Sequence, residues 1–358
     1  MNRQHGTEEI MESARENSRL KEQIREIQDT LQAFYEAYSE LIKKTQENTD
    51  HVLMFSKYIQ YLQADCANLK YELMDPTVSR EEYFYPEFRS DEETLRLILE
   101  EKKSLARFGD GEFSIAVSSP RHEFQRMDDR LARRIREVLD TDGCGGRLLI
   151  GIADQYGSLE RFNRESAQRI RIYMTDEIRR QHRELLRTDR IYSDAYITRP
   201  YVLFRDLDTD APGRRFAALK EIWKDKRVII VEGSQTRLGV GNDLLAQARE
   251  VRRILAPPTS SFDRYDDLYE ECLKQAEGAD LFLLAIGPSS GVLAYDLTLQ
   301  SCQALDVGHI DLEYEWFLAG KGVRTPVPNK YNNEIAGGDA VGEVDDPIYR
   351  SQIIASFV

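Results

Sequence analysis

Two carboxylates lie two residues apart in a glycine-flanked turn within the stretch Leu105–Phe113. In an extended segment Asp110 and Glu112 would point to the same side, because side chains alternate along a strand. The flanking glycines permit backbone angles that larger residues resist and let a ligand approach the main chain. Such a pair suits a hard divalent cation that bridges to phosphate oxygens. The competing interpretation is a solvated acidic turn, since the same spacing recurs at Asp91 in this acidic chain.

Two later loops carry groups suited to an anion. Arg237 is followed by two glycines and then by Asn242 and Asp243 at an expected helix start, and a GPSSG loop places Ser289 and Ser290 at another. A helix N-terminus presents unpaired N–H groups to phosphate, and arginine donates forked hydrogen bonds to it. Ordinary helix capping explains the last four residues without a ligand, so both interpretations stay open.

The loop GHIDLEYEW gathers an imidazole and several carboxylates after a predicted strand. His309 is one of five histidines. It could serve as metal ligand, general base or diphosphate partner, or as a structural hydrogen-bonding group. Asp311, Glu313 and Glu315 alternate behind it, and they could present acids to a sugar hydroxyl or cap a helix.

Composition limits the function classes. The chain has 358 residues, a net charge of −14, 41% hydrophobic and 31% charged residues, which together predict a soluble protein with a core. The negative charge argues against bulk nucleic-acid binding but leaves room for a nucleotide ligand. No run approaches the roughly 18 apolar residues of a membrane span, and the N-terminus lacks a signal-peptide core. The four cysteines show no metal-ligand spacing. We therefore expect a cytoplasmic protein.

Short apolar strands alternate with helical patterns after about residue 90. This order predicts an α/β fold, a Rossmann-like, mostly parallel sheet with helices on both faces, in which ligands collect beyond the carboxyl ends of the strands. Among the predicted helices are one long arginine-rich helix over Leu159–Arg187 and a short one over Asn242–Arg249.

A long N-terminal helix precedes this domain. Apolar residues recur at spacings of four and three from Leu20 to Leu73, with a polar interruption at Thr45 and Asn48, which predicts a left-handed coiled coil. Such a helix must bury its stripe against a partner. Self-association into a homo-oligomer is the simplest answer, and packing onto the downstream domain is the alternative. The predicted ranges are 1–75 for the coiled coil, 76–90 for a linker, 91–343 for the catalytic domain and 344–358 for a C-terminal extension.

With these loops assembled, the chain resembles the GT-D-type bacterial glycosyltransferases, a family first catalogued as a domain of unknown function. The resemblance covers roughly residues 95–342. It rests on six motifs in the family's order, RFGDGE, ITRPY, EGSQTRLGVGNDL, GPSSGVLAYDL, GHIDLEYEW and KYNNEIAGG. It implies a Rossmann-like enzyme that takes a nucleotide-sugar donor, usually a UDP-sugar, with manganese held by the Asp-x-Glu motif at Asp110 and Glu112. Members of the family extend glycans on bacterial surface glycoproteins.

The hypothesis is a metal-dependent hexosyltransferase that moves a sugar from a nucleotide-sugar to a glycan or glycoprotein. Asp110 and Glu112 would hold Mn²⁺ or Mg²⁺, with His309 as a possible third ligand. Asp311 is the candidate base and Glu313 its competitor. The groups expected to line the diphosphate or sugar are Arg107, Arg237, Asn242, Asp243, Ser289 and Ser290. Two alternatives remain open, a metal-dependent phosphohydrolase acting on a nucleotide or sugar phosphate, and a coiled-coil interaction protein with a degenerate domain.

Overall fold

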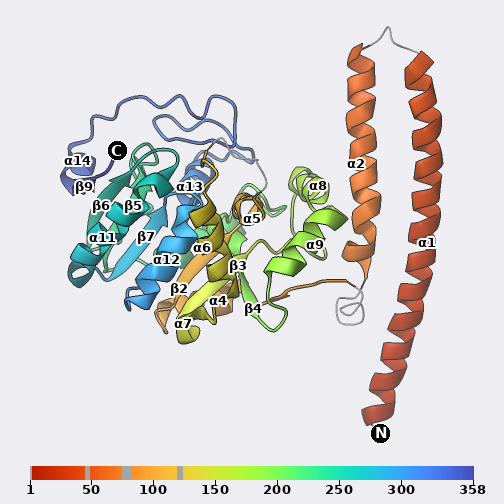
Figure 1. The fold of residues 1–358 in the computed structure, drawn as a ribbon, viewed down its shortest axis with the longest axis horizontal. Coiled ribbons are helices and arrows are strands. Elements are labelled where there is room, and N and C mark those ends of the chain that lie inside the picture. The colour runs from red at the N-terminus through yellow and green to blue at the C-terminus, as the bar shows by residue number, and fades with distance from the viewer. Residues whose placement is uncertain (1, 45–48, 75–82, 119–123) are drawn as a thin grey trace. The chain divides into compact units, whose positions relative to one another are not determined.

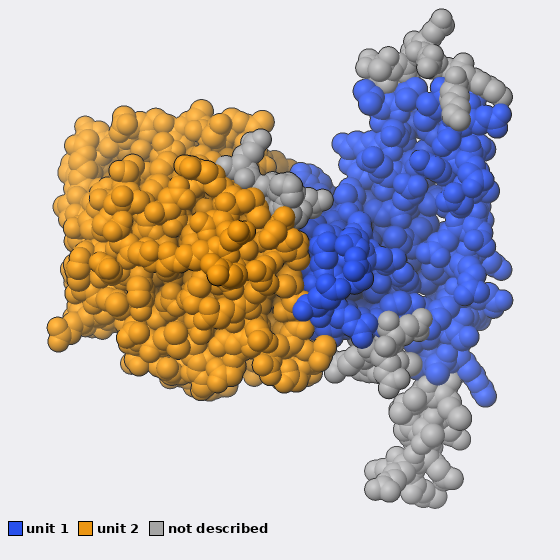
Figure 2. Space-filling model, in the orientation of Figure 1, with its two compact units in different colours: residues 1–86, 155–184 blue, residues 87–154, 185–358 orange. Residues whose placement is uncertain are grey.

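The computed structural model describes residues 2–44, 49–74, 83–118 and 124–358. The chain forms two compact units, coloured separately in Figure 2. Unit 1 comprises Met1–Pro86 and Gln155–Glu184, and unit 2 comprises Glu87–Asp154 and Leu185–Val358. The grouping differs from the predicted ranges, because residues 155–184 join the N-terminal helices and the C-terminal segment joins unit 2.

Unit 2 is built on a nine-stranded, all-parallel sheet in the order β1-β4-β3-β2-β8-β7-β5-β6-β9. The strands are β1 Glu87–Phe88, β2 Ser104–Phe108, β3 Leu148–Ile152, β4 Ile191–Asp194, β5 Arg227–Gly233, β6 Glu250–Ala256, β7 Leu281–Ala285, β8 Ala304–Asp306 and β9 Ile353–Ser356. The apolar runs of β3 and β7 are buried along their whole length, as expected for strands covered on both faces. The predicted α/β fold is confirmed.

Helices surround this sheet (Figure 1). They are α4 Asp91–Leu99, α5 Asp110–Ala116, α6 Asp129–Asp140, α7 Gly143–Gly146, α10 Ala211–Lys220, α11 Tyr265–Gln275, α12 Ser289–Leu299, α13 Ile310–Leu318 and α14 Pro347–Gln352, with 3₁₀ turns at Ala195–Thr198, Ser261–Arg264 and Ala276–Gly278. Local signals set their ends: Ser90 accepts a hydrogen bond from the N–H of Glu93 at the start of α4, while Leu97 and Ile98 are buried on its inner face.

The direction of chain progression changes between the neighbouring strands β2 and β8. From β2 the chain moves to β3 on one side, and it reaches β8 from β7 on the other. In parallel sheets such a switch point opens a crevice at the carboxyl ends of the strands. The acidic turn leaves β2 and the GHID loop leaves β8, so the fold brings these two motifs to the same place.

Unit 1 is helical. It contains α1 Asn2–Lys44, α2 Thr49–Leu73, α8 Arg164–Tyr173 and α9 Asp176–Leu185. Helices α1 and α2 run antiparallel side by side (Figure 1), joined for example by the amide of Gln28, which donates to the carbonyl of Cys66. Helix α2 also packs on α8, where Arg171 forms a forked ion pair with Glu72. No helix in the described part of the chain is long and apolar enough to cross a membrane.

The long N-terminal helix α1 is confirmed, but the apolar stripe is divided between two separate helices that pack on each other. The polar positions Thr45 and Asn48 lie outside the described residues. The single helix predicted over Leu159–Arg187 was wrong: it breaks between α8 and α9, where Met174 leaves helical geometry and is buried.

The predicted helix Asn242–Arg249 was also wrong. The segment forms consecutive turns with bonds from Ala246 N–H to Asp243 and from Ala248 N–H to Leu245. Burial of Leu244 and a hydrogen bond from the Trp223 indole to its carbonyl fix this shorter path, so tertiary contacts override a modest local preference. The predicted C-terminal extension instead supplies α14 and the edge strand β9.

Candidate active site

The acidic turn begins a helix rather than continuing the strand. Strand β2 ends at Phe108, and α5 starts at Asp110, with Gly109 as its N-cap. Glu112 Oε2 accepts a hydrogen bond of 2.7 Å from the Gly109 N–H, while Asp110 Oδ1 accepts one of 3.0 Å from the Gly111 N–H. A glutamate at the third helical position commonly reaches back to the N-cap in this way. The predicted extended geometry was therefore wrong, although both carboxylates remain at the end of β2.

A third carboxylate joins this pair. Asp306, the last residue of β8, is buried and lies close enough to Glu112 to act on it electrostatically. Burial, together with the negative charges of Asp306 and Asp110, raises the pKa of Glu112 to about 7. The end of β2 and the end of β8 thus concentrate negative charge at the switch point.

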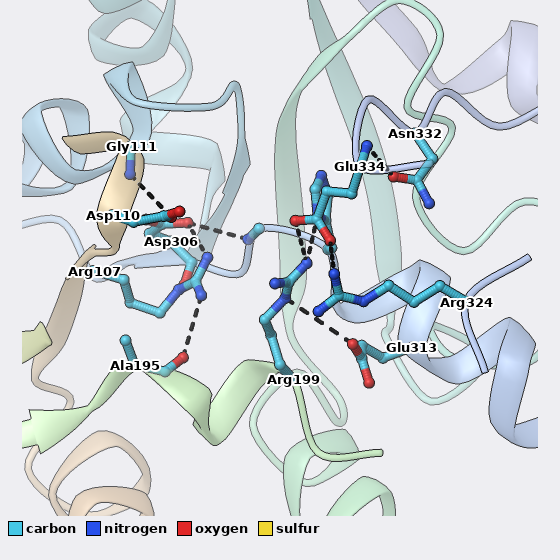
Figure 3. Close-up of polar contacts among 12 residues, drawn as sticks. Arg107, Asp110, Gly111, Ala195, Arg199, Asp306, Glu313, Arg324, Asn332 and Glu334 are labelled. Carbon is cyan, nitrogen blue, oxygen red and sulfur yellow. Dashed lines mark hydrogen bonds and ion pairs between the residues drawn. The ribbon is translucent and has the colours of Figure 1, made fainter. Parts of the chain in front are cut away.

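Arg107 joins the two strand ends. Its Nη2 pairs with Asp306 Oδ1 at 2.9 Å, its Nε donates to the Asp306 carbonyl at 2.8 Å, and its Nη1 donates to the Ala195 carbonyl at 3.2 Å (Figure 3). Burial raises the pKa of Asp306, and Arg107 opposes the rise. The guanidinium also presses against Gly308, where φ is +47° and an added Cβ would lie 2.0 Å from Nη2. A larger residue there would have to displace the guanidinium, and the positive φ also favours glycine.

A second cluster adjoins the first through the short link from Asp306 to His309. Arg199 Nη2 lies 2.8 Å from His309 Nδ1 and 2.5 Å from Glu334 Oε1, and His309 Nδ1 lies 3.1 Å from that same oxygen. Arg324 pairs with the other oxygen of Glu334 at 3.1 Å (Figure 3). Burial acts to raise the pKa of Glu334, but Arg199, His309 and Arg324 outweigh it and hold the pKa well below its usual value.

The two predicted base residues are buried and already bonded. Asp311 is 3% exposed, and its carboxylate accepts from the Gly239 N–H and Asn242 and pairs with Lys330 Nζ at 2.6 Å. Glu313 is 0% exposed, and its Oε2 accepts from the N–H groups of residues 201 and 202. Burial raises the pKa of both carboxyls.

Lys330 and Asn242 hold a second carboxylate one turn along α13. Glu315 Oε1 accepts from Lys330 Nζ at 2.7 Å and from Asn242 Nδ2 at 2.7 Å. Its side chain is 23% exposed, whereas that of Asp311 is 4% exposed. Glu315 is therefore the carboxylate of this network that meets solvent.

Four other predicted ligand-binding residues bond within the protein. Arg237 donates to the carbonyls of Asn329 and Gly342. Asp243 pairs with Lys220 and accepts from the Tyr314 hydroxyl. The remaining two are Ser289, which bonds Ser261, and Ser290, which accepts from the Ile286 N–H; both are at most 1% exposed.

The GPSSG loop shows a packing reason for its small residues. A Cβ at Gly291 would lie 3.1 Å from the Phe108 ring and 3.2 Å from the Arg107 carbonyl. Helix α12 therefore approaches β2 closely enough that large residues would not fit. Neither serine caps α12, whose N-cap is Pro288, and both bond within the protein in a closely packed loop.

Of the predicted residues, Arg107, Asp110 and Glu112 come together, and His309 lies in the adjoining cluster. The site residues that sequence reasoning did not assign are Asp306, Arg199, Arg324, Lys330 and Glu334. Apart from Arg324, they lie in or directly beside the six motifs. Spacing could not reveal their partners, because Arg199 and Glu334 are separated by 135 positions.

The cluster suits a cation only in part. Among the described residues, no group of three His, Cys, Asp or Glu side chains is placed to hold a metal ion alone. Two carboxylates beside a third negative charge can nevertheless hold Mg²⁺ or Mn²⁺ when substrate phosphates and water complete the coordination. Asp110 and Glu112 thus supply two carboxylates at this place, and a cation there would need further ligands from outside the protein.

Three comparisons bear on this arrangement. The sequence profile described as "Glycosyltransferase GT-D fold" matches residues 105–335. The probable glycosyl transferase Gly of Streptococcus gordonii is 33% identical over 268 residues, covering 75% of this chain and 38% of the relative. The glycosyltransferase GlyD of Streptococcus pneumoniae serotype 4 (strain ATCC BAA-334 / TIGR4) is 34% identical over 264 residues, covering 74% of this chain and 32% of the relative. The chain thus spans about a third of the length of these curated relatives.

Solved structures agree with the fold. One, described as a highly conserved domain of unknown function 1792 with a distinct glycosyltransferase fold, has a TM-score of 0.70 and 30% identity, covering 76% of this chain and 95% of that chain. Another, a glycosyltransferase (DUF1792) from Streptococcus sanguinis, has a TM-score of 0.70 and 32% identity, covering 76% of this chain and 100% of that chain.

Proposed function

Because the chain belongs to the family of glycosyltransferases with the GT-D fold, we propose that unit 2 moves a hexose from a nucleotide-sugar, a UDP-sugar, to a hydroxyl group of a glycan or glycoprotein. One observation carries the proposal beyond family membership. The Asp-x-Glu turn of β2 and the GHID loop of β8 meet at the switch point of a parallel sheet, where such folds bind their ligands.

Asp110 and Glu112 are the proposed cation ligands. Glu112 uses one oxygen to accept from Gly109, and Asp110 is exposed. Both can therefore offer oxygen atoms to a cation at the carboxyl ends of the strands. A bound Mn²⁺ or Mg²⁺ would stabilise the negative charge that develops on the leaving diphosphate.

His309 stays a proposed third ligand under one condition. Arg199 can only donate, so a neutral imidazole that accepts from it at Nδ1 carries its proton on Nε2 and cannot bind a metal there. If Nδ1 instead carries the proton and donates to Glu334, Nε2 has a free lone pair. Metal-bound histidines usually donate their second N–H to a carboxylate, so we assign the second state to the cation-bound enzyme.

The arginines divide between positioning and charge. Arg107 fixes Asp306 and Gly308, and thereby the start of the GHID loop. Arg199 and Arg324, held by Glu334, supply the positive charge proposed to face the diphosphate. Arg237 bonds main-chain carbonyls, so it shapes the neighbouring loop instead.

The base is reassigned in this proposal. Asp311 and Glu313 are buried and accept hydrogen bonds from the main chain, so we propose that they position the loops that contain Gly239 and Tyr201. Glu315 keeps one oxygen on Lys330 and Asn242, and its side chain is 23% exposed. A carboxylate held in this way can accept the proton of an acceptor hydroxyl that binds at the carboxyl ends of the strands.

The experiment is a screen of nucleotide-sugars with Mn²⁺ and a glycopeptide acceptor, reading both released nucleotide and the mass of the acceptor. The proposal expects nucleotide release that depends on Mn²⁺ and an acceptor heavier by one hexose. A nucleoside monophosphate and a sugar phosphate with an unchanged acceptor would favour the phosphohydrolase. Absence of any metal-dependent turnover with any donor would favour the degenerate-domain alternative.

A further inference from the structure

Residues 31–42 of α1 and 52–62 of α2 include several large apolar side chains that are exposed to solvent. Phe34 is 56% exposed, Met54 59%, Phe55 46% and Tyr58 58%. Tyr38 stacks on Phe34 at 6.5 Å and contacts Phe55 at 5.8 Å between ring centroids, so the aromatic residues of α1 meet Phe55 of α2. We call Phe34, Met54, Phe55 and Tyr58 the tip patch.

Charged residues are few in the same region of both helices. Nine of the 18 residues from Glu12 to Asp29 are charged, but only two of the 12 from Leu31 to Ile42. On α2 only Lys57 is charged among the 11 residues from Val52 to Leu62. A solvent-exposed helix in a chain with 31% charged residues is expected to carry more charged residues than these two stretches do.

The patch continues a helix face that is covered elsewhere. Residues 54, 58, 61, 65, 68 and 72 follow one another at spacings of four and three, so they form one face of α2. From residue 61 to residue 72 this face packs on α8. Gln168 donates to the Tyr61 carbonyl, Asn68 donates to the Arg171 carbonyl, and Arg171 pairs with Glu72. Nearer the start of α2, the side chains of Met54 and Tyr58 on the same face are not covered by another helix among the described residues.

We propose that a second copy of this chain covers the tip patch, so that two helical hairpins pair into a four-helix bundle. The α1–α2 pair leaves this apolar patch exposed, and a four-helix bundle is a common arrangement that buries such faces. The patch side chains are each about half exposed. At roughly 150–250 Å² for each large side chain, the four patch residues offer roughly 300–500 Å² per copy, about half of the roughly 800 Å² per partner of a stable interface.

Charge also favours a second copy over a membrane surface. Among the side chains that the structure describes, the exposed charges beside the patch are Glu36 and Glu40 on α1 and Lys57 on α2. In a two-fold pairing the lysine of one copy can meet a glutamate of the other, since an isologous interface places each patch on itself. Helices that bind anionic membranes carry many Lys and Arg residues on their polar face, whereas Lys57 is the only such residue within Leu31–Ile42 and Val52–Leu62.

Light scattering coupled to gel filtration, from about 1 to about 100 μM, tests the proposal on the full chain without any assay of catalysis, so its outcome is independent of the proposed function. The wild-type chain should run as a dimer. Met54→Glu/Tyr58→Glu should raise the dissociation constant by at least about 100-fold, because it places two unpaired carboxylates in an apolar interface. Gln60→Glu is the matched control, adding the same charge on another face of α2.

A charge exchange gives a second readout. Lys57→Glu should weaken the dimer, and Glu36→Lys in the same chain should restore much of the loss. A monomeric wild-type chain, or a dimer equally unaffected by the Met54→Glu/Tyr58→Glu change and by the control, would overturn the proposal. Binding of a monomer to anionic vesicles that the same variant abolishes would assign the patch to a membrane and overturn it as well.

Discussion

The raised pKa of Glu112 leads to a measurable dependence of stability on pH. Its pKa is about 7 in the folded chain against an ordinary value of 4.5, so the folded state holds the proton more tightly than the unfolded state. The stabilisation is fully present below pH 4.5 and is lost as the pH rises towards 7. The full difference corresponds to about 3 kcal/mol, and partial exposure of the side chain reduces the expected loss to about 2 kcal/mol.

The assay is urea unfolding of metal-free protein at pH 5, 6, 7 and 8, for the wild type and for Glu112→Gln. Glutamine still accepts from the Gly109 N–H, so the variant keeps the turn and removes only the titration. Other buried carboxyls contribute equally to both proteins. The difference in the free energy of unfolding between variant and wild type should therefore grow by about 2 kcal/mol from pH 5 to pH 8. Parallel pH profiles would refute the reasoning.

Three further changes test other parts of the site. Lys330→Met should destabilise the chain by about 3–5 kcal/mol in urea, because it leaves the buried carboxylate of Asp311 unpaired, and adding Asp311→Asn should recover part of the loss. Gly308→Ala should lower kcat at least about 10-fold, since its Cβ would displace the Arg107 guanidinium. Glu334→Gln should weaken Mn²⁺ binding by about 10–100-fold in calorimetric titration, if His309 is a ligand oriented by that carboxylate.

Matched controls separate these effects from general strain. Gly320 also has a positive φ, +62° against +47° at Gly308, but a Cβ there would meet nothing within 4 Å, so Gly320→Ala should leave kcat near the wild-type value. Glu343→Gln removes an exposed carboxylate near the same loop and should leave Mn²⁺ affinity unchanged. Equal losses in a variant and its control would contradict the specific role.

The sequence was sufficient for the sheet and for the location of the acidic turn. Runs such as Leu281–Ala285 are short and apolar at every position, as expected of strands covered on both faces. Ligands of parallel sheets bind at the carboxyl ends of the strands, which identified the loops to inspect. The start of α5 was missed because a carboxylate two residues from another reads equally as strand or helix cap. The reach of Glu112 to Gly109 decides between them.

Side-chain partners were the part that sequence could not give. Arg237, with glycines behind it, has the composition of a phosphate loop, yet its guanidinium bonds the Asn329 carbonyl, 92 positions away. Lys330 opens the KYNNEIAGG motif, but its pairing becomes visible only once the fold brings it to Asp311. Such choices depend on long-range geometry, since a buried charge is stable only next to its partner.

The most direct test compares nucleotide release from the preferred donor by the wild type, by Asp110→Asn and by Asp91→Asn, with and without Mn²⁺. Asp91 has the same spacing to a glutamate at the start of α4, and so serves as the matched control. The account predicts normal unfolding of all three proteins, full metal-dependent turnover in the wild type and the control, and none in Asp110→Asn. Full activity of Asp110→Asn would contradict the central claim.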